Sequence, residues 1–106
     1  MLEYNIDLTG KTILVTGAAG FIGSNLVKRL LNDFEPIKVI GIDSITDYYD
    51  VNLKYERLKE IESLSKDWAF IHGSIADKTL IEKVFSENKI DVVVNLAAQA
   101  GVRYSI

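Results

Sequence analysis

Short apolar runs alternate along the chain with longer segments in which apolar residues recur every three or four positions. The short runs are rich in β-branched residues, which is typical of buried strands. They predict strands at residues 12–15, 37–42, 68–72 and 91–96. The longer segments have the spacing of amphipathic helices. They predict helices at residues 21–31 and 51–65, and a third helix that begins after an N-cap at Asp77.

The order strand, helix, strand, helix, strand, helix, strand predicts an α/β fold. Parallel strands joined by right-handed crossovers place helices on both faces of one sheet. Each predicted strand is almost continuously apolar, as expected of strands that are covered on both faces. We therefore predict an open parallel sheet of four strands in a three-layer α/β/α arrangement.

The glycine-rich stretch TGAAGFIG, residues 16–23, lies between the first predicted strand and the first predicted helix. A helix N-terminus offers unpaired N–H groups and the positive end of the helix dipole, which suits a phosphate. Gly17 would allow a tight turn, Gly20 would let a pyrophosphate approach bare backbone, and Gly23 would let the helix lie close to the sheet. Asp43 lies 20 residues after Gly23, where an acid would bind ribose hydroxyls. Together these features predict a dinucleotide site.

The glycine spacing leaves one alternative open. It is G-x-x-G-x-x-G, whereas the common dinucleotide fingerprint is G-x-G-x-x-G. A loop of turn and packing glycines that binds no ligand is therefore the alternative. A phosphate loop of the NTPase type is excluded, because no Gly-Lys-Ser/Thr follows.

Composition narrows the classes of function. A chain of 106 residues has the size of one domain, and its hydrophobic (48%) and charged (25%) fractions are ordinary for a globular protein. A formal charge of −3 gives no electrostatic reason to expect a nucleic acid or a membrane as partner. With no cysteine and His72 as the single histidine, we predict neither disulfides nor a metal site. No long apolar run and no signal peptide are found, so a cytoplasmic location is expected.

TGAAGFIGSNL, followed by a strand that ends in Asp43, resembles the N-terminal half of the extended short-chain dehydrogenases/reductases, the NAD-dependent nucleotide-sugar epimerases and dehydratases. GIDSITDYYDVNLKYERL and NLAAQAGVRYSI are most similar to the UDP-glucuronate 4-epimerase branch. The similarity runs from Lys11 to Ile106. It implies that residues 1–106 are the N-terminal part of a Rossmann-like NAD-binding domain with strand order 3-2-1-4. Residues 1–10 would then be a leader segment, and the substrate domain would be absent.

The resemblance also implies the residues of the site. Phe21 and Ile22 would give backbone N–H groups to a pyrophosphate lined by the three glycines, and Asp43 would bind the adenosine ribose. The further cofactor contacts would be Ser44 next to that acid, Ser74 and Ile75 at the adenine, and Leu96, Ala97, Ala98 and Gln99 toward the nicotinamide. The family usually has Asn in place of Ser44 and Asp in place of Ser74. The Ser74 hydroxyl can still bond the adenine amino group, without charge assistance.

Two further expectations concern the ligands. Asp43 would repel the 2′-phosphate of NADP, and no arginine or lysine is expected nearby to receive one, so NAD is predicted as the cofactor. Arg103 is the candidate on the substrate side, since a guanidinium suits phosphate or carboxylate. A surface arginine that binds nothing is the alternative reading of Arg103.

The activity implied for the full-length protein is that of a nucleotide-sugar epimerase, which forms a 4-keto sugar and passes hydride to and from NAD. UDP-glucuronate 4-epimerase is the first candidate. The alternatives are a nucleotide-sugar 4,6-dehydratase, a UDP-glucose or UDP-N-acetylglucosamine 4-epimerase, and a non-catalytic NAD-sensing regulator. A UDP-sugar substrate and a homodimer are implied as partners. The apolar edge of the fourth strand, residues 92–96, would invite self-association of the chain.

Enzymes of this family use a Tyr-x-x-x-Lys pair, and the chain contains one at Tyr55 and Lys59. We predict that this pair is not catalytic, because the family's pair lies on a later helix, beyond the fourth strand. Tyr55 also shares an apolar stripe with Val51 and Leu58, so that packing would explain it. The true pair would lie after Ile106. The chain by itself is therefore predicted to hold no catalytic residue and to be inactive.

Overall fold

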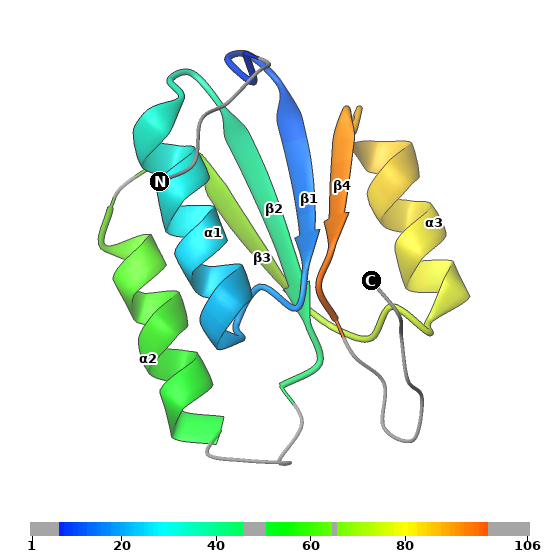
Figure 1. The fold of residues 1–106 in the computed structure, drawn as a ribbon. Coiled ribbons are helices and arrows are strands. Elements are labelled where there is room, and N and C mark those ends of the chain that lie inside the picture. Colours follow the sequence, from blue (N-terminus) through cyan, green and yellow to red (C-terminus); the bar gives the residue numbers. More distant parts are fainter. Residues whose placement is uncertain (1–6, 46–50, 65, 98–106) are drawn as a thin grey trace.

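A computed structural model of the chain describes residues 7–45, 51–64 and 66–97. The elements alternate along the chain as predicted (Figure 1). In order they are β1 (Thr12–Thr16), α1 (Phe21–Asp33), β2 (Lys38–Asp43), α2 (Val51–Glu62), β3 (Trp68–His72), α3 (Lys78–Glu87) and β4 (Val92–Asn95).

The strands form one sheet with the order β3-β2-β1-β4 (Figure 1). All three pairings are parallel; on β1, for example, Leu14 lies between Ile40 of β2 and Val93 of β4. The prediction of an open parallel sheet with strand order 3-2-1-4 is therefore confirmed. Because the strands are parallel, their carboxyl ends meet at one edge of the sheet, which the glycine loop also borders.

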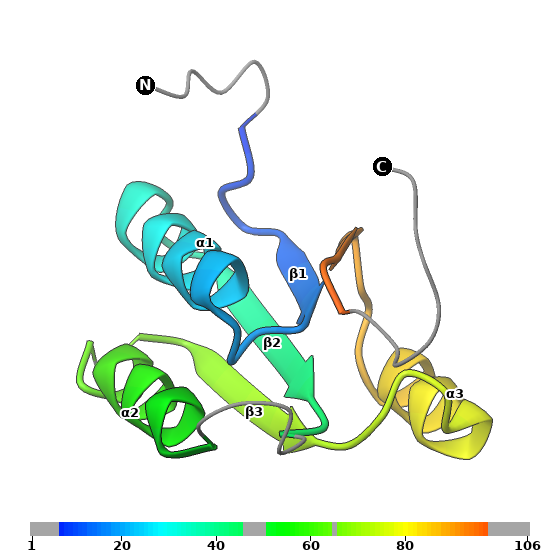
Figure 2. The ribbon, with the colours of Figure 1, turned by 60° about the horizontal axis from the view of Figure 1, so that its bottom comes forward.

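Helices cover both faces of this sheet, which confirms the predicted three layers. Figures 1 and 2 show α1 and α2 on one face and α3 on the other. Alternate side chains of β1 pack on opposite faces of the sheet. Ile13 and Val15 pack in the cluster under α1, whereas Leu14 packs with Val84 of α3. This double burial explains why the strand reads as an unbroken apolar run.

The predicted cap of the third helix is confirmed. The Asp77 side chain accepts a hydrogen bond from the backbone N–H of Leu80 at 3.1 Å. This contact satisfies one of the N–H groups that the first turn of a helix leaves without a partner.

The prediction that Tyr55 belongs to the buried stripe of α2 is wrong. Its side chain is 48% exposed, whereas Leu58 and Ile61 are buried. The third inward position is filled by Lys54, which lies one turn before Leu58 and is buried beside Asp43. A carboxylate next to the helix therefore turns a lysine inward and the neighbouring tyrosine outward. The side chain of Val51 lies outside the described residues.

β4 lies at the edge of the sheet, as predicted, and its α3 face is only partly covered. Val93 is 48% exposed and Phe85 of α3 is 45% exposed. Self-association through this edge stays a prediction, and a charge at Val93 should suppress it, because charged residues on an edge strand disfavour pairing with another chain. We expect the chain to form a concentration-dependent dimer in sedimentation equilibrium and Val93→Lys to stay monomeric.

A matched control places the same charge at the other edge. Ala69 on β3 is exposed, so Ala69→Lys should leave the dimer of the unmodified chain intact. A monomeric Ala69→Lys chain together with a dimeric Val93→Lys chain would move the contact from β4 to β3 and contradict the prediction.

Candidate functional site

Gly17 makes the turn that leads out of β1. Its φ of +71° lies in the left-handed region that side chains rarely adopt. A Cβ at this position would also come within 2.9 Å of the backbone of Leu96 and Ala97, which leave β4. The Gly17 N–H donates to the Ile42 carbonyl of β2 at 2.8 Å. The loop is therefore held between the ends of β2 and β4, and the predicted turn at Gly17 is confirmed.

Gly23 lets α1 lie directly on this turn. A Cβ at Gly23 would overlap the carbonyl oxygen of Gly17 and crowd the Cα of Ala18. The obstacle is backbone on both sides, so no side chain could move aside to make room. Gly17 and Gly23 are thus required by the fold itself.

Gly20 differs from its two neighbours in the motif. Its backbone is extended, with φ −73°, and a Cβ would meet the Gly17 carbonyl oxygen at 3.2 Å, a tight contact without overlap. Gly20 is the N-cap of α1, no side chain among the described residues caps this terminus, and the first turn carries no acidic residue. The N-terminus of a helix of 13 residues is therefore approached over bare backbone. This arrangement fits an anion such as a phosphate.

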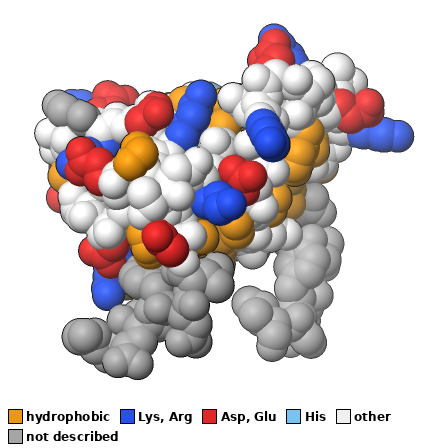
Figure 3. Space-filling view, turned by 90° about the horizontal axis from the view of Figure 1, so that it is seen from above, with side chains coloured by type: hydrophobic (Ala, Val, Ile, Leu, Met, Phe, Trp, Pro, Cys, Tyr) orange, Lys and Arg blue, Asp and Glu red, His pale blue; other side chains and the backbone are white. Residues whose placement is uncertain are grey.

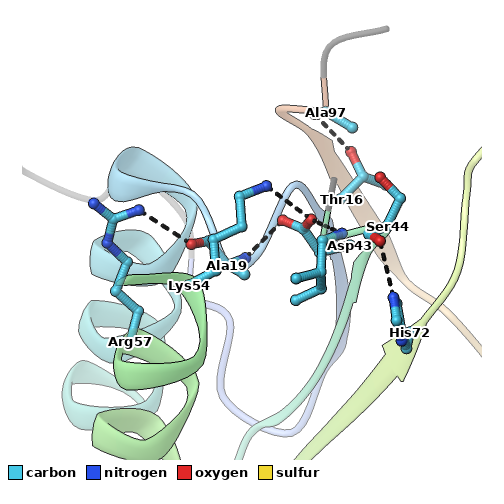
Figure 4. Close-up of polar contacts among 9 residues, drawn as sticks. Thr16, Ala19, Asp43, Ser44, Lys54, Arg57, His72 and Ala97 are labelled. Atoms are coloured by element: carbon cyan, nitrogen blue, oxygen red, sulfur yellow. Dashed lines mark hydrogen bonds and ion pairs between the residues drawn. The ribbon is translucent and has the colours of Figure 1, made fainter. Parts of the chain in front are cut away.

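Asp43, at the end of β2, is 6% exposed and joins three segments. Its Oδ2 accepts the Ala19 N–H of the glycine loop at 3.0 Å, and its Oδ1 accepts the Ile45 N–H at 2.8 Å. Lys54 Nζ of α2 lies 3.1 Å from the same Oδ1 (Figure 4). The Asp43 carboxylate thus fixes the glycine loop through the Ala19 N–H, in addition to any role in binding a ribose.

The sequence analysis did not find Lys54, and its expectation that no lysine lies near Asp43 is wrong. Lys54 is 8% exposed, and it forms a buried ion pair with the acid. Removing one partner of such a pair leaves an uncompensated charge, at a cost of about 3–5 kcal/mol. The available indication was its helical spacing from Leu58 and Ile61, at i+4 and i+7.

Arg57 is a second cation of α2 that reaches the glycine loop. Its Nη1 donates to the Ala19 carbonyl at 3.3 Å, and its Cζ lies 5.8 Å from the centroid of the Phe21 ring. Figure 4 shows Lys54 and Arg57 projecting from the same helix toward the loop and Asp43. Phe21 and Ile22, whose N–H groups were predicted to bind a pyrophosphate, have side chains that are 68% and 69% exposed.

The other predicted contacts that the structure describes lie at the same edge of the sheet. Ser44 is exposed, and its carbonyl accepts a hydrogen bond from His72 Nε2 at 2.8 Å. Ser74 and Ile75 are half-buried in the turn after β3, where the Ser74 Oγ accepts the Ala76 N–H at 3.0 Å.

Thr16, the last residue of β1, binds two of the predicted cofactor-contact residues, which follow the end of β4. The N–H groups of Leu96 and Ala97 donate to its Oγ1 at 3.0 and 3.2 Å. Thr16 is a buried positioning residue that the sequence analysis missed. Ala98, Gln99 and Arg103 lie outside the described residues.

The opposite edge of the sheet holds a cavity of about 510 Å³ at the amino ends of β1 and β2. Its charged lining residues are of both signs: Lys11, Lys38, Lys66, Glu35 and Asp67. Figure 3 shows cationic and anionic side chains interspersed on this face. None of the predicted site residues that the structure describes lines the cavity. In the described ranges, no three acidic or histidine side chains group as metal ligands would, and no helix has the length and apolar character to cross a bilayer.

The fold, the glycine loop between β1 and α1, and Asp43 after β2 define a Rossmann-like α/β protein. The family model described as GDP-mannose 4,6 dehydratase matches residues 14–106, and the chain belongs to this family. CapI of Staphylococcus aureus is 51% identical over 94 residues, which are 89% of this chain and 27% of that protein.

Two solved structures show the same architecture. The dTDP-glucose 4,6-dehydratase of Bacillus anthracis in complex with NAD superposes with a TM-score of 0.73 at 37% identity, over 86% of this chain and 28% of that one. The UDP-glucuronic acid 4-epimerase of Bacillus cereus, in complex with UDP-glucuronic acid and NAD, superposes with a TM-score of 0.71 at 41% identity. The match covers 87% of this chain and 28% of that one. The chain thus spans roughly a quarter of these relatives. The predicted resemblance to nucleotide-sugar epimerases and dehydratases is confirmed.

Proposed function

We propose that this chain binds NAD and forms the cofactor-binding part of a nucleotide-sugar epimerase of the UDP-glucuronate 4-epimerase type. The observation that carries the proposal is the gathering, at one edge of the sheet, of an uncapped helix N-terminus behind Gly20 and a buried carboxylate, Asp43. Ligands of open α/β sheets bind at this carboxyl edge. The NAD in both solved relatives supports the choice of cofactor.

The geometry supports a partner for the pyrophosphate and one for a ribose hydroxyl. The pyrophosphate would lie over Gly20 and accept N–H groups of Phe21 and Ile22. A carboxylate has about four acceptor positions, and three donors of the described chain, the Ala19 and Ile45 N–H groups and Lys54, already reach Asp43. A ribose hydroxyl would take a remaining position.

The chain's own residues bind and orient, and the proton transfer belongs to residues beyond it. When bound, NAD would accept and return the hydride at C4 of the sugar. That step needs a base at the 4-hydroxyl, a contribution of about 10²–10⁴-fold. Tyr55 and Lys59 are exposed on α2, on the side of the helix away from its buried face. We therefore propose that the chain alone turns over no sugar nucleotide and that Arg103 acts on the substrate side of the full-length protein.

Gly20 provides the direct test of binding. A Cβ at Gly20 would meet the Gly17 carbonyl oxygen at 3.2 Å without overlapping it, and we expect a larger side chain to enter the space assigned to the pyrophosphate. We expect NAD to bind the chain in isothermal titration calorimetry, and Gly20→Val to weaken it by more than about tenfold, the equivalent of losing 1.4 kcal/mol. Circular dichroism should show an unchanged fold. Ala69→Val adds a similar side chain at an exposed position of β3 and should bind NAD like the unmodified chain.

Two results would contradict the proposal. One is the absence of any NAD binding by the folded chain. The other is a Gly20→Val chain that binds NAD as tightly as the unmodified one, since this would leave the three glycines as turn and packing residues only.

A further inference from the structure

Two groups fix the Ala19 peptide units from opposite sides. The Ala19 N–H donates to Asp43, and the Ala19 carbonyl accepts from Arg57 at 3.3 Å (Figure 4). A peptide unit is planar, so the Ala19 carbonyl and the Gly20 N–H turn together. The bond from Arg57 therefore fixes the direction of the Gly20 N–H, which points toward the Gly17 carbonyl at 3.1 Å.

The same guanidinium acts on the other side of Gly20. It lies 5.8 Å from the centre of the Phe21 ring, within the range of a cation–π contact. Phe21 is the first residue of α1, and two thirds of its side chain is exposed. Arg57 thus holds both residues that flank Gly20, and it brings a positive charge to the helix N-terminus.

We propose that Arg57 is a positioning residue for the diphosphate of the dinucleotide. This inference rests on the proposed NAD function. It assigns different parts of the dinucleotide to the two cationic residues of α2. Lys54 acts at the ribose end of the site through Asp43, and Arg57 acts at the diphosphate end through Ala19 and Phe21. Loss of Arg57 should therefore weaken ligands that carry phosphates and leave a nucleoside without phosphates unaffected.

The test compares ADP with adenosine, because both carry the adenine and ribose and only ADP carries the diphosphate. Binding to the isotope-labelled chain is followed by amide chemical shifts in NMR titrations, which also measure weak affinities. We expect Arg57→Met to lose about tenfold in ADP affinity, the scale of one hydrogen bond to a charged group, and to bind adenosine within twofold of the unmodified chain. The Gly20 amide shift should change in the free variant.

Two further variants separate the positioning role of Arg57 from the effect of its positive charge alone. Lys59→Met removes one positive charge from an exposed position of the same helix and should leave ADP affinity unchanged. Arg57→Lys keeps the charge but lacks the planar fork that can bond a carbonyl and stack on a ring. It should restore only part of the ADP affinity. Should Arg57→Met not fold, Arg57→Lys carries the test, with an expected severalfold loss for ADP alone.

The outcomes distinguish the inference from the function on which it rests. Equal losses for ADP and adenosine would show that Arg57 only stabilises α2 and would overturn the inference. An equal loss in Lys59→Met would overturn it as well, because bulk charge would then explain the effect. If the unmodified chain binds neither ligand nor NAD, the proposed function itself is wrong.

Discussion

Gly23→Ala is expected to lower the free energy of unfolding by about 3 kcal/mol or more, or to prevent folding. The sign of this change in stability is the reverse of the usual one, since alanine within a helix is normally about 1 kcal/mol more favourable than glycine. The reason is that the added Cβ would overlap the Gly17 carbonyl oxygen, and both partners are backbone. Relief would require α1 to move away from the turn, which would disturb the packing of Val27 and Leu31 on the sheet.

Urea unfolding followed by the fluorescence of Trp68, the only tryptophan of the chain, measures this change. Gly20→Ala is the matched control, because it makes the same substitution three residues earlier, where the new Cβ meets only a 3.2 Å contact. The control should lose less than about 1 kcal/mol. Equal stabilities of the two variants would contradict the assignment of Gly23 to the fold and Gly20 to the ligand.

The fold was largely predictable because its determinants are local. The apolar run through Ile13, Leu14 and Val15 is typical of a strand covered on both faces, and the structure covers it from both sides. The position of Asp43 at the end of β2 follows from the same reasoning. The sequence analysis gave the three glycines separate roles, but it could not name the atoms that crowd Gly17 and Gly23, because those backbone segments meet only in the folded chain.

Periodicity did not decide the cationic side of the site, because Lys54 and Tyr55, four and three residues before Leu58, both have a helical spacing from it. Hydrophobic spacing assigned Tyr55 to the buried face of α2, whereas Lys54 occupies it. The buried lysine lies against a carboxylate 11 residues earlier in the sequence, and the two meet only after folding. The inward direction of Arg57 likewise depends on how α2 docks beside the glycine loop. Such long-range compensation of charge cannot be recognised from the composition of the helix.

Asp43→Asn is expected to shift the nucleotide preference of the chain from NAD toward NADP. In the unmodified chain the carboxylate would repel a 2′-phosphate, and Lys54 is bound to that carboxylate at 3.1 Å. The amide removes the repulsion, keeps one oxygen as an acceptor and removes the negative charge that Lys54 faces at Asp43. Lys54 would then donate to a 2′-phosphate, a charge-assisted bond of about 1.5–3 kcal/mol, or roughly tenfold or more in affinity. The variant should be less stable by about 3 kcal/mol, so a folded state is verified first.

The double variant Asp43→Asn/Lys54→Met separates the two causes of this shift. If Lys54 receives the phosphate, the gain in NADP affinity should disappear in the double variant, while the loss in NAD affinity, caused by the missing carboxylate, should persist. Calorimetric titration of each chain with both nucleotides gives the full cycle, in which the coupling of two contacting residues is measured directly. An Asp43→Asn chain that keeps the original preference for NAD would contradict the prediction. A double variant that still gains NADP affinity would show that the acid acts by repulsion alone, and that its buried lysine serves only to neutralise it.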